Sequence, residues 1–335
     1  VVVHQHGCGE GSCRSGLTGA FDLHWQALAR RHHCALLAPS YEQPQESACY
    51  RWCDPRFGSG DTFRRGLEDL AELSGHPELS KVPWVLWGHS GGASWVGIMT
   101  SLYPERVAAT WMRSGSAPTQ PDPKYADVLP VSITDAMTKV PMMLNLGTKE
   151  GVTETEGRFA KVWPSQKRLF DELRLRNGLV AVAVDPKTGH ECGNQRYLAI
   201  PWFDACLGQR LPEVVGDPLR SMSTDDVWLA RVLGVDAVPA KEYTGAMNQS
   251  VWLPNEAVAN AWMQYSKDAE VEDATRPPSP KEIEVGDGMI AWTADADLES
   301  GIQQFIVYRD DQVFAQIPEK PTNRFGRPLF QGLQY

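Results

Sequence analysis

Residues 84–95, which read WVLWGHSGGASW, decide the fold. An apolar run typical of a buried strand leads into GHSGG at residues 88–92, and a segment with helical character follows. This is the pattern G-x-S-x-G, which between a strand and a helix holds a serine at a sharp turn with its hydroxyl exposed above the sheet. Larger side chains at Gly88 and Gly92 would collide with the neighbouring strand and helix. The pattern predicts that Ser90 is a nucleophile, and an ordinary glycine-rich loop is the alternative.

Apolar strands alternate with amphipathic helices along most of the chain. Strands are expected at residues 1–3, 34–39, 84–87, 107–112, 140–146 and 179–184, and helices at 21–32, 62–73, 93–102, 163–176 and 194–207. Continuous apolar strands are typical of parallel sheets that are covered on both faces. The alternation therefore predicts an α/β fold with a doubly wound, mostly parallel sheet. The aromatic segment 40–61 has no clear period and is expected to be a long loop that lines a cleft or covers the sheet edge.

The length and charge of the chain narrow the classes of function. A chain of 335 residues suits one large α/β domain with an appendage. The net charge of −10 without a basic stripe argues against nucleic acid and against an anionic membrane surface as partners. No apolar run is long enough for a membrane span. The opening VVVHQHG has no initiator methionine and no signal peptide, from which we expect that N-terminal sequence has been removed.

The cysteines leave two alternatives open. Their number is odd, so they cannot all pair within the chain, and they occupy positions 8, 13, 34, 49, 53, 192 and 206. Local disulfides between Cys49 and Cys53 and between Cys192 and Cys206 would fit an oxidising compartment. Buried free thiols are the alternative. A zinc site is not expected, because the cysteines lack paired C-x-x-C spacing.

A catalytic triad can be assembled by position. A serine hydroxyl needs a base, usually a histidine oriented by a buried carboxylate, and in this type of fold the order is serine, acid, histidine. Of the eight histidines, His190 alone follows Ser90, and it lies just beyond the last strand. Glu150 follows the penultimate strand and is the favoured acid. Asp185, at the end of the last strand, is the alternative acid, or it caps the turn there.

The small residues after the first strand indicate where an oxyanion would bind. The loop HGCGEG at residues 6–11 lets backbone N–H groups approach a substrate oxygen closely. We expect the N–H of Cys8 and that of Gly91 to form the oxyanion hole. A tight turn that merely needs glycine is the alternative for the loop. His89, inside the GHSGG turn, is expected to pack or hydrogen-bond beside the nucleophile.

These motifs together resemble those of a known superfamily. HGCG at 6–9, GHSGG at 88–92 and GHE at 189–191, in this order over residues 1–210, resemble the α/β-hydrolase superfamily. Within it, the chain is similar to secreted esterases of the polyhydroxybutyrate-depolymerase and feruloyl-esterase kind. The early strands that such proteins have before the His-Gly loop are absent here. The resemblance implies ester hydrolysis through an acyl-enzyme, without a metal or an organic cofactor.

The pattern changes after residue 213, which ends the expected hydrolase domain (1–213). Residues 214–273 are expected to form a helical extension, with helices at 221–233 and 255–265, that packs on the hydrolase or covers its cleft. Residues 274–281, which begin ATRPPSP, have the composition of a linker. Residues 282–335, with alternating strands at 289–293, 303–309 and 313–317, resemble part of a fibronectin type III module.

The leading hypothesis is therefore a serine esterase. Its substrate is a carboxylic ester, with polymeric and polysaccharide-linked esters among the candidates. A serine peptidase on the same fold is the first alternative, since amides and esters share the acyl-enzyme route. A binding protein with an idle triad is the second. The fibronectin-like segment and the resemblance favour a secreted or periplasmic location.

Overall fold

A parallel sheet forms the centre of the computed structural model, which describes residues 1–8, 19–41 and 49–321. Within these residues the sheet has six strands in the order β2-β1-β3-β4-β5-β6, and every neighbouring pair is parallel. The strands are β1 (Val2–Gln5), β2 (Leu36–Leu37), β3 (Trp84–His89), β4 (Val107–Arg113), β5 (Met142–Gly147) and β6 (Val180–Asp185). Their carboxyl ends meet at one edge, which is where ligands bind in open α/β sheets.

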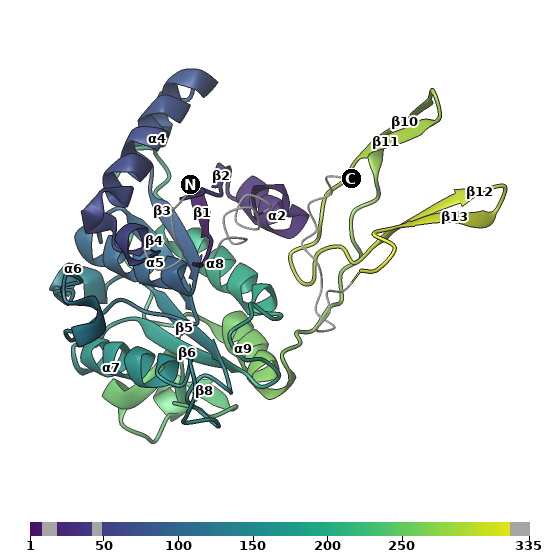
Figure 1. Ribbon diagram of the computed structural model, residues 1–335. Helices are drawn as coiled ribbons and strands as arrows, with labels where there is room; N and C mark the ends of the chain where they lie inside the picture. Colours follow the sequence, from purple (N-terminus) through teal and green to yellow (C-terminus); the bar gives the residue numbers. More distant parts are fainter. Residues whose placement is uncertain (9–18, 42–48, 322–335) are drawn as a thin grey trace.

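Helices cover both faces of this sheet (Figure 1). One face carries α4 (Ser59–Ser74), α5 (Gly91–Leu102) and α7 (Val162–Leu175). The other carries α2 (Leu23–Arg31), α8 (Arg196–Arg210) and α9 (Glu256–Asp268). Two further helices, α3 (Cys49–Cys53) and α6 (Asp135–Thr138), are short. The predicted α/β fold with a doubly wound parallel sheet is confirmed.

Tryptophans make up much of the core between sheet and helices. Trp84 and Trp87 on β3, Trp95 on α5 and Trp111 on β4 are each at most 2% exposed. Trp163, at the start of α7, is only half-buried, and its backbone N–H donates to the carbonyl of Glu150 at 2.9 Å. Strand β3 and helix α5 are therefore fixed by close packing, which limits how far Ser90, between them, can move.

The segment 40–61 is not wholly irregular. It contains α3 and a 3₁₀ turn at Pro55–Phe57, and α4 already begins at Ser59. The Asp54 carboxylate caps the 3₁₀ turn by accepting from Arg56 N, and Gly58 at φ +112° then redirects the chain into α4. Residues 42–48 lie outside the described ranges. Other 3₁₀ turns lie at Gly19–Phe21, Pro77–Ser80, Pro123–Tyr125, Ala240–Glu242 and Met247–Gln249.

Residues 214–273 form a mixed unit rather than a helical one. Strands β7 (Trp228–Arg231), β8 (Ala237–Pro239) and β9 (Ser250–Leu253) form an antiparallel sheet in the order β8-β7-β9. The helix expected at 221–233 is therefore wrong, because the ladder with β8 and β9 buries Leu229 and Ala230 in extended conformation. The helix expected at 255–265 is α9. Trp262 on α9 donates its indole N–H to the carbonyl of Val182 on β6 at 2.7 Å.

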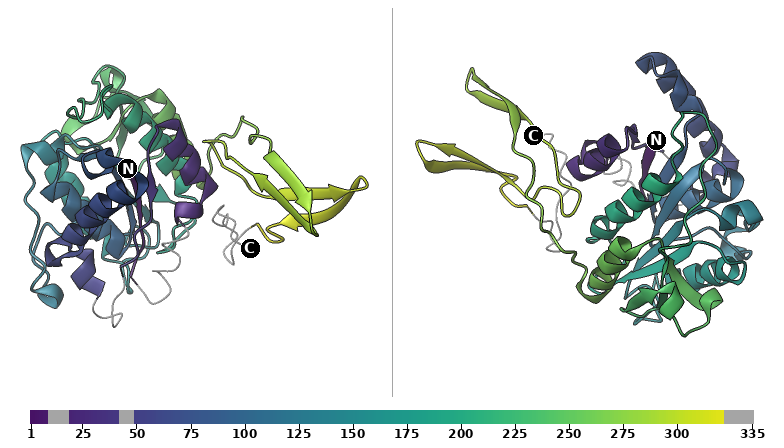
Figure 2. Two further views of the ribbon diagram at one scale, coloured as in Figure 1. Left: turned by 90° about the horizontal axis from the view of Figure 1, so that it is seen from above. Right: turned by 180° about the vertical axis from the view of Figure 1, so that it is seen from behind.

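The C-terminal part is a small all-β module of antiparallel hairpins, as the sequence predicts. One hairpin pairs β10 (Lys281–Gly286) with β11 (Met289–Thr293), and the other pairs β12 (Phe305–Arg309) with β13 (Gln312–Ile317). Figure 2 shows both hairpins projecting beside α2, away from the central sheet. The segment between the two hairpins contacts α2 through an Arg30–Asp295 ion pair of 2.7 Å and a hydrogen bond of 3.1 Å between His24 Nε2 and the carbonyl of Leu298.

No helix in the described part of the chain combines the length and the apolar character needed to cross a membrane.

Candidate active site

Ser90 occupies the sharp turn between β3 and α5. Its backbone has φ +56° and ψ −117°, a conformation that few residues other than glycine adopt, and it costs about 1–3 kcal/mol. A Cβ at Gly88 would lie 2.3 Å from the carbonyl oxygen of Gly92, and one at Gly92 would lie 2.4 Å from that of His6. Only glycine fits either position, so these contacts explain the motif and hold Ser90 in its strained conformation.

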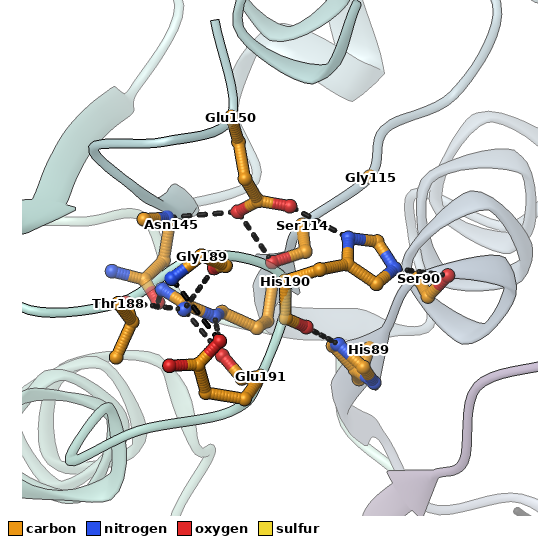
Figure 3. A network of polar contacts seen from close by, with 12 residues as sticks. His89, Ser90, Ser114, Gly115, Asn145, Glu150, Thr188, Gly189, His190 and Glu191 are labelled. Atoms are coloured by element: carbon orange, nitrogen blue, oxygen red, sulfur yellow. Dashed lines mark hydrogen bonds and ion pairs between the residues drawn. The ribbon is translucent and has the colours of Figure 1, made fainter. Parts of the chain in front are cut away.

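Three loops at the carboxyl edge of the sheet bring Ser90, His190 and Glu150 together (Figure 3). His190 Nε2 lies 2.9 Å from Ser90 Oγ, and His190 Nδ1 lies 2.6 Å from Glu150 Oε1. Ser90 follows β3, Glu150 follows β5 and His190 follows β6. The side chains that the sequence predicts as nucleophile, acid and base thus form one hydrogen-bonded chain.

The surroundings of Glu150 keep it ionised. Its side chain is fully buried, and Oε2 accepts hydrogen bonds from Ser114 Oγ at 2.7 Å and from the N–H of Gly147 at 2.8 Å. Burial by itself raises the pKa of this carboxyl group. The hydrogen bond from His190, the charge of Arg113 and the bonds from Gly147 and Ser114 outweigh burial, so the pKa lies below its ordinary value. Glu150 can therefore accept from His190 as a carboxylate.

His190 is held in its neutral form. Its burial lowers the pKa of the imidazole, and the nearby His89 and Arg113 lower it further. Glu150 acts in the opposite direction without reversing the shift. Because Nδ1 donates to Glu150, Nε2 is free to accept the proton of Ser90. This is the protonation state that a general base needs.

Asp185, the alternative acid, points elsewhere. It is fully buried at the end of β6, and its Oδ1 accepts from the N–H of Lys187 at 2.9 Å. The hydroxyl of Tyr265 on α9 lies 3.5 Å from Asp185 Oδ2. Asp185 therefore stabilises the turn that follows β6, while Glu150 is the carboxylate in contact with His190.

A disulfide places Cys8 beside Gly91. Cys8, after β1, is bonded to Cys49 on α3, with 5.7 Å between their Cα atoms. A Cβ at Gly91 would lie 2.3 Å from Cys8 Sγ and 2.4 Å from Cys53 Sγ. The two residues predicted to supply oxyanion donors are thus in contact at the start of α5. Residues 9–11 of the predicted oxyanion loop lie outside the described ranges.

The cysteine pairs predicted from sequence proximity are wrong. Cys49 is bonded to Cys8, which arrives from a different element, and leaves Cys53 as a thiol whose Sγ lies 3.1 Å from Cys49 Sγ. Cys192 and Cys206 are free thiols. The sulfurs of Cys8, Cys49 and Cys53 are near enough to one another to hold a metal ion, but the disulfide occupies two of them. Cys13 lies outside the described residues.

Several contacts at the site carry no signal in the sequence. Phe159 stacks on the ring of His190, with 3.6 Å between centroids and 5° between planes. Ser114 bonds to Glu150, yet its neighbourhood has no motif. The sequence did indicate a hydrogen-bonding role for His89, whose Nε2 donates to the carbonyl of His190 at 2.6 Å. Burial lowers the pKa of His89, but interaction with Cys192 and this carbonyl raises it above its ordinary value.

Comparisons with known proteins place few limits on the activity. No protein-family model matches the chain, and no curated protein matches it. Among solved structures, the chain is similar to one described as a thermostable esterase, with 16% sequence identity and a TM-score of 0.35. The match covers 55% of this chain and 45% of that one, so the chain spans less than half of the matched protein's length. So weak a likeness says nothing about chemistry, and the activity must be argued from the contacts around Ser90.

Proposed function

We propose that this protein is a serine hydrolase that cleaves carboxylic esters through an acyl-enzyme. Ser90 Oγ attacks the ester carbonyl while His190 Nε2 takes the proton of the Ser90 hydroxyl. His190 then delivers this proton to the departing alcohol, and water repeats the sequence to release the acid. Glu150 holds His190 in the correct tautomer and stabilises the imidazolium that forms. These steps call for neither a metal ion nor an organic cofactor.

One observation carries this proposal, namely the continuous chain of hydrogen bonds from Ser90 through His190 to Glu150. The bonds are 2.9 Å and 2.6 Å long, and the terminal carboxylate is buried and ionised. Nucleophile, base and orienting acid within hydrogen-bond reach are the signature of an activated serine. The strained turn at Ser90 supports the same interpretation, because strain of this kind clusters at functional sites.

We propose that the N–H groups of Cys8 and Gly91 stabilise the oxyanion. Gly91 is the first residue of α5, where unpaired N–H groups and the helix dipole favour negative charge. The disulfide through Cys49 fixes the chain at Cys8 beside it. Two donors on separate rigid elements need no reorganisation as charge develops on the carbonyl oxygen.

The test is hydrolysis of p-nitrophenyl acetate by the wild-type protein and by Ser90→Ala. We expect turnover only in the wild-type protein, with both proteins folded by circular dichroism. A fluorophosphonate probe should label the wild-type protein at Ser90. Equal turnover in the variant would sink the proposal, and an unlabelled wild-type protein would favour an idle triad. Faster cleavage of aminoacyl amides than of esters would favour the peptidase alternative.

We further propose that the protein acts in an oxidising, extracytoplasmic setting, on esters that include polymeric or polysaccharide-linked ones. The Cys8–Cys49 disulfide supports this location, because such bonds persist mainly in oxidising compartments. In this proposal residues 1–213 carry the chemistry and residues 214–273 cover β6. The hairpin module beyond the 274–281 linker is a fibronectin type III-like spacer or interaction surface.

A further inference from the structure

Arg113 connects the nucleophile to the loop that carries the base. It is the last residue of β4, between β3 and β5, and it pairs in register with His89 on one side and with Asn145 on the other. Its backbone carbonyl accepts the N–H of Ser90 at 2.8 Å. Its side chain is fully buried and hydrogen-bonds to the loop after β6. One residue therefore contacts both Ser90 and the loop that carries His190.

The guanidinium group of Arg113 is bound almost entirely by residues 186–195, the loop between β6 and α8 that carries His190 and is called the base loop below. Nη2 donates to Thr188 Oγ1 at 2.8 Å and to the carbonyl of Gly189 at 3.2 Å. Nε donates to the carbonyl of Glu191 at 3.1 Å, and Nη2 also contacts this oxygen. Nη1 donates to Asn145 Oδ1 at 2.9 Å on β5. The residues on both sides of His190 are thus fixed to the sheet by one planar group.

Among the described residues no carboxylate forms a direct ion pair with Arg113, although its charge interacts with that of the ionised Glu150. None of the ion pairs among these residues includes its side chain, and its acceptors are neutral carbonyl, hydroxyl and amide oxygens. A buried cation that is not directly paired with a carboxylate is costly, and a neutral side chain could satisfy some of these acceptors. The arrangement is therefore explained better if the charge itself has a use at this site.

We propose that Arg113 is a positioning residue for His190, which holds the base loop against Ser90. This inference rests on the proposed esterase function. The five donors of a guanidinium group lie in one plane and can reach several loop oxygens at once, which the ammonium group of lysine cannot do. The base loop lies between β6 and α8 and includes no helix or strand. The guanidinium group therefore does for this loop what regular structure does for Ser90.

The position of Arg113 also has an electrostatic consequence, which follows from the charges around His190. Glu150 faces it on Nδ1, His89 lies on its backbone side, and His89 in turn interacts with Cys192. Glu150 favours the imidazolium form, while Arg113 and His89 disfavour it. Removing the charge of Arg113 therefore raises the pKa of His190, and the enzyme loses activity at a higher pH when it is acidified.

Two substitutions separate geometry from charge. Arg113→Lys keeps the charge but loses the planar set of donors, whereas Arg113→Met loses both. We expect each to lower kcat on p-nitrophenyl acetate about 100-fold with little change in KM, because a displacement of about 1 Å costs about that much. Only Arg113→Met should move the acid limb of kcat/KM to higher pH. Wild-type kcat in Arg113→Lys, or an unshifted acid limb in Arg113→Met, would overturn the proposal.

Two further variants control for folding. Thr188→Val removes one acceptor of the guanidinium group without changing charge, and we expect a several-fold lower kcat with the wild-type acid limb. An unchanged kcat in this variant would count against the proposal even if the Arg113 variants fail to fold. Arg210→Lys is the matched control, since Arg210 is also buried and also binds a carbonyl, that of Lys139 at 2.7 Å. It should lower stability and leave both kcat and the pH profile unchanged.

Fluorophosphonate labelling of Ser90 separates this proposal from the proposed function. A wild-type protein that neither hydrolyses esters nor reacts with the probe contradicts the esterase itself. A wild-type protein that does both, with Arg113 variants of unchanged kcat and pH profile, contradicts only the role of Arg113. Slower labelling of Ser90 in Arg113→Lys than in Arg210→Lys supports the role of Arg113 independently of turnover.

Discussion

Replacing Glu150 by glutamine should stop the base from working while leaving the site intact. The reason lies in how the two carboxylate oxygens are used. Oε1 accepts from His190 Nδ1 at 2.6 Å, and Oε2 accepts from the backbone N–H of Gly147 at 2.8 Å. A backbone N–H can only donate, so the amide oxygen of the introduced glutamine must stay on the Gly147 side. The amide NH₂ then faces His190.

This orientation forces the imidazole into the wrong tautomer. With a donor opposite Nδ1, His190 must accept there and carry its proton on Nε2, which then cannot take the proton of Ser90. The same loss of tautomer in a serine protease lowers kcat about 10,000-fold, which corresponds to about 5 kcal/mol of transition-state stabilisation. We expect a similar loss here with nearly unchanged KM, because the substituted atom does not touch the substrate.

The assay is kcat and KM for p-nitrophenyl acetate, with Asp185→Asn as the matched control. Asp185 is also a buried carboxylate at a strand end, but its Oδ1 accepts from the N–H of Lys187, and asparagine keeps that acceptor. We expect Asp185→Asn to lower stability and to change kcat less than about tenfold, since it leaves the tautomer of His190 untouched. A Glu150→Gln enzyme within tenfold of wild type, or an Asp185→Asn enzyme as impaired as we expect Glu150→Gln to be, would refute the assignment of the acid.

Three further predictions follow from the contacts around the triad. Because burial lowers the pKa of His190, and catalysis needs its neutral form, the acid limb of kcat/KM should have its midpoint below pH 6.5, as a pH–rate profile would show. Phe159→Leu removes a ring stacked on the imidazole, and if the ring stabilises the imidazolium by about 0.5–2 kcal/mol, kcat should fall about 2- to 30-fold and the acid limb should move to lower pH. Cys8→Ser keeps the N–H at residue 8 but frees it from α3, so kcat should fall about tenfold under non-reducing conditions, which is less than the loss of a whole oxyanion donor. Cys34→Ser, which alters a free thiol, should leave kcat unchanged.

The parts of the site that the sequence predicts are those set by local geometry and chain order. The turn at Ser90 requires glycine at 88 and 92 because their Cβ atoms would strike backbone oxygens, so its motif is visible in the sequence. Parallel strands bring their carboxyl ends together, which places any residue just beyond β5 or β6 near Ser90. Chain order then singles out His190 and favours Glu150, and their catalytic roles stay a prediction.

The parts that the sequence does not predict depend on contacts between distant segments. Cys49 and Cys53 are one helical turn apart and look like a natural pair, yet the loop after β1 brings Cys8 to Cys49. Trp228 lies in a stretch with helical spacing that is drawn into a ladder with β8 and β9. Phe159 lies in a stretch that resembles any polar loop, and its place over His190 depends on where that loop folds back.

Arg113 shows why such residues are missed when only motifs are considered. In the sequence it is an ordinary cation at the end of an apolar strand, where an exposed side chain would be expected. In the structure its side chain is buried by the loop after β6, whose oxygens bind it. This loop lies more than seventy positions further along the chain, so the sequence around Arg113 gives no sign of it. Ser90 and Glu150 are fixed by a strained turn and by a buried pair of donors, but His190 lies in a loop with neither. A side chain in such a loop needs a group from the rigid sheet to hold it in place. From the end of β4 the side chain of Arg113 reaches both flanks of His190, while its backbone bonds to Ser90.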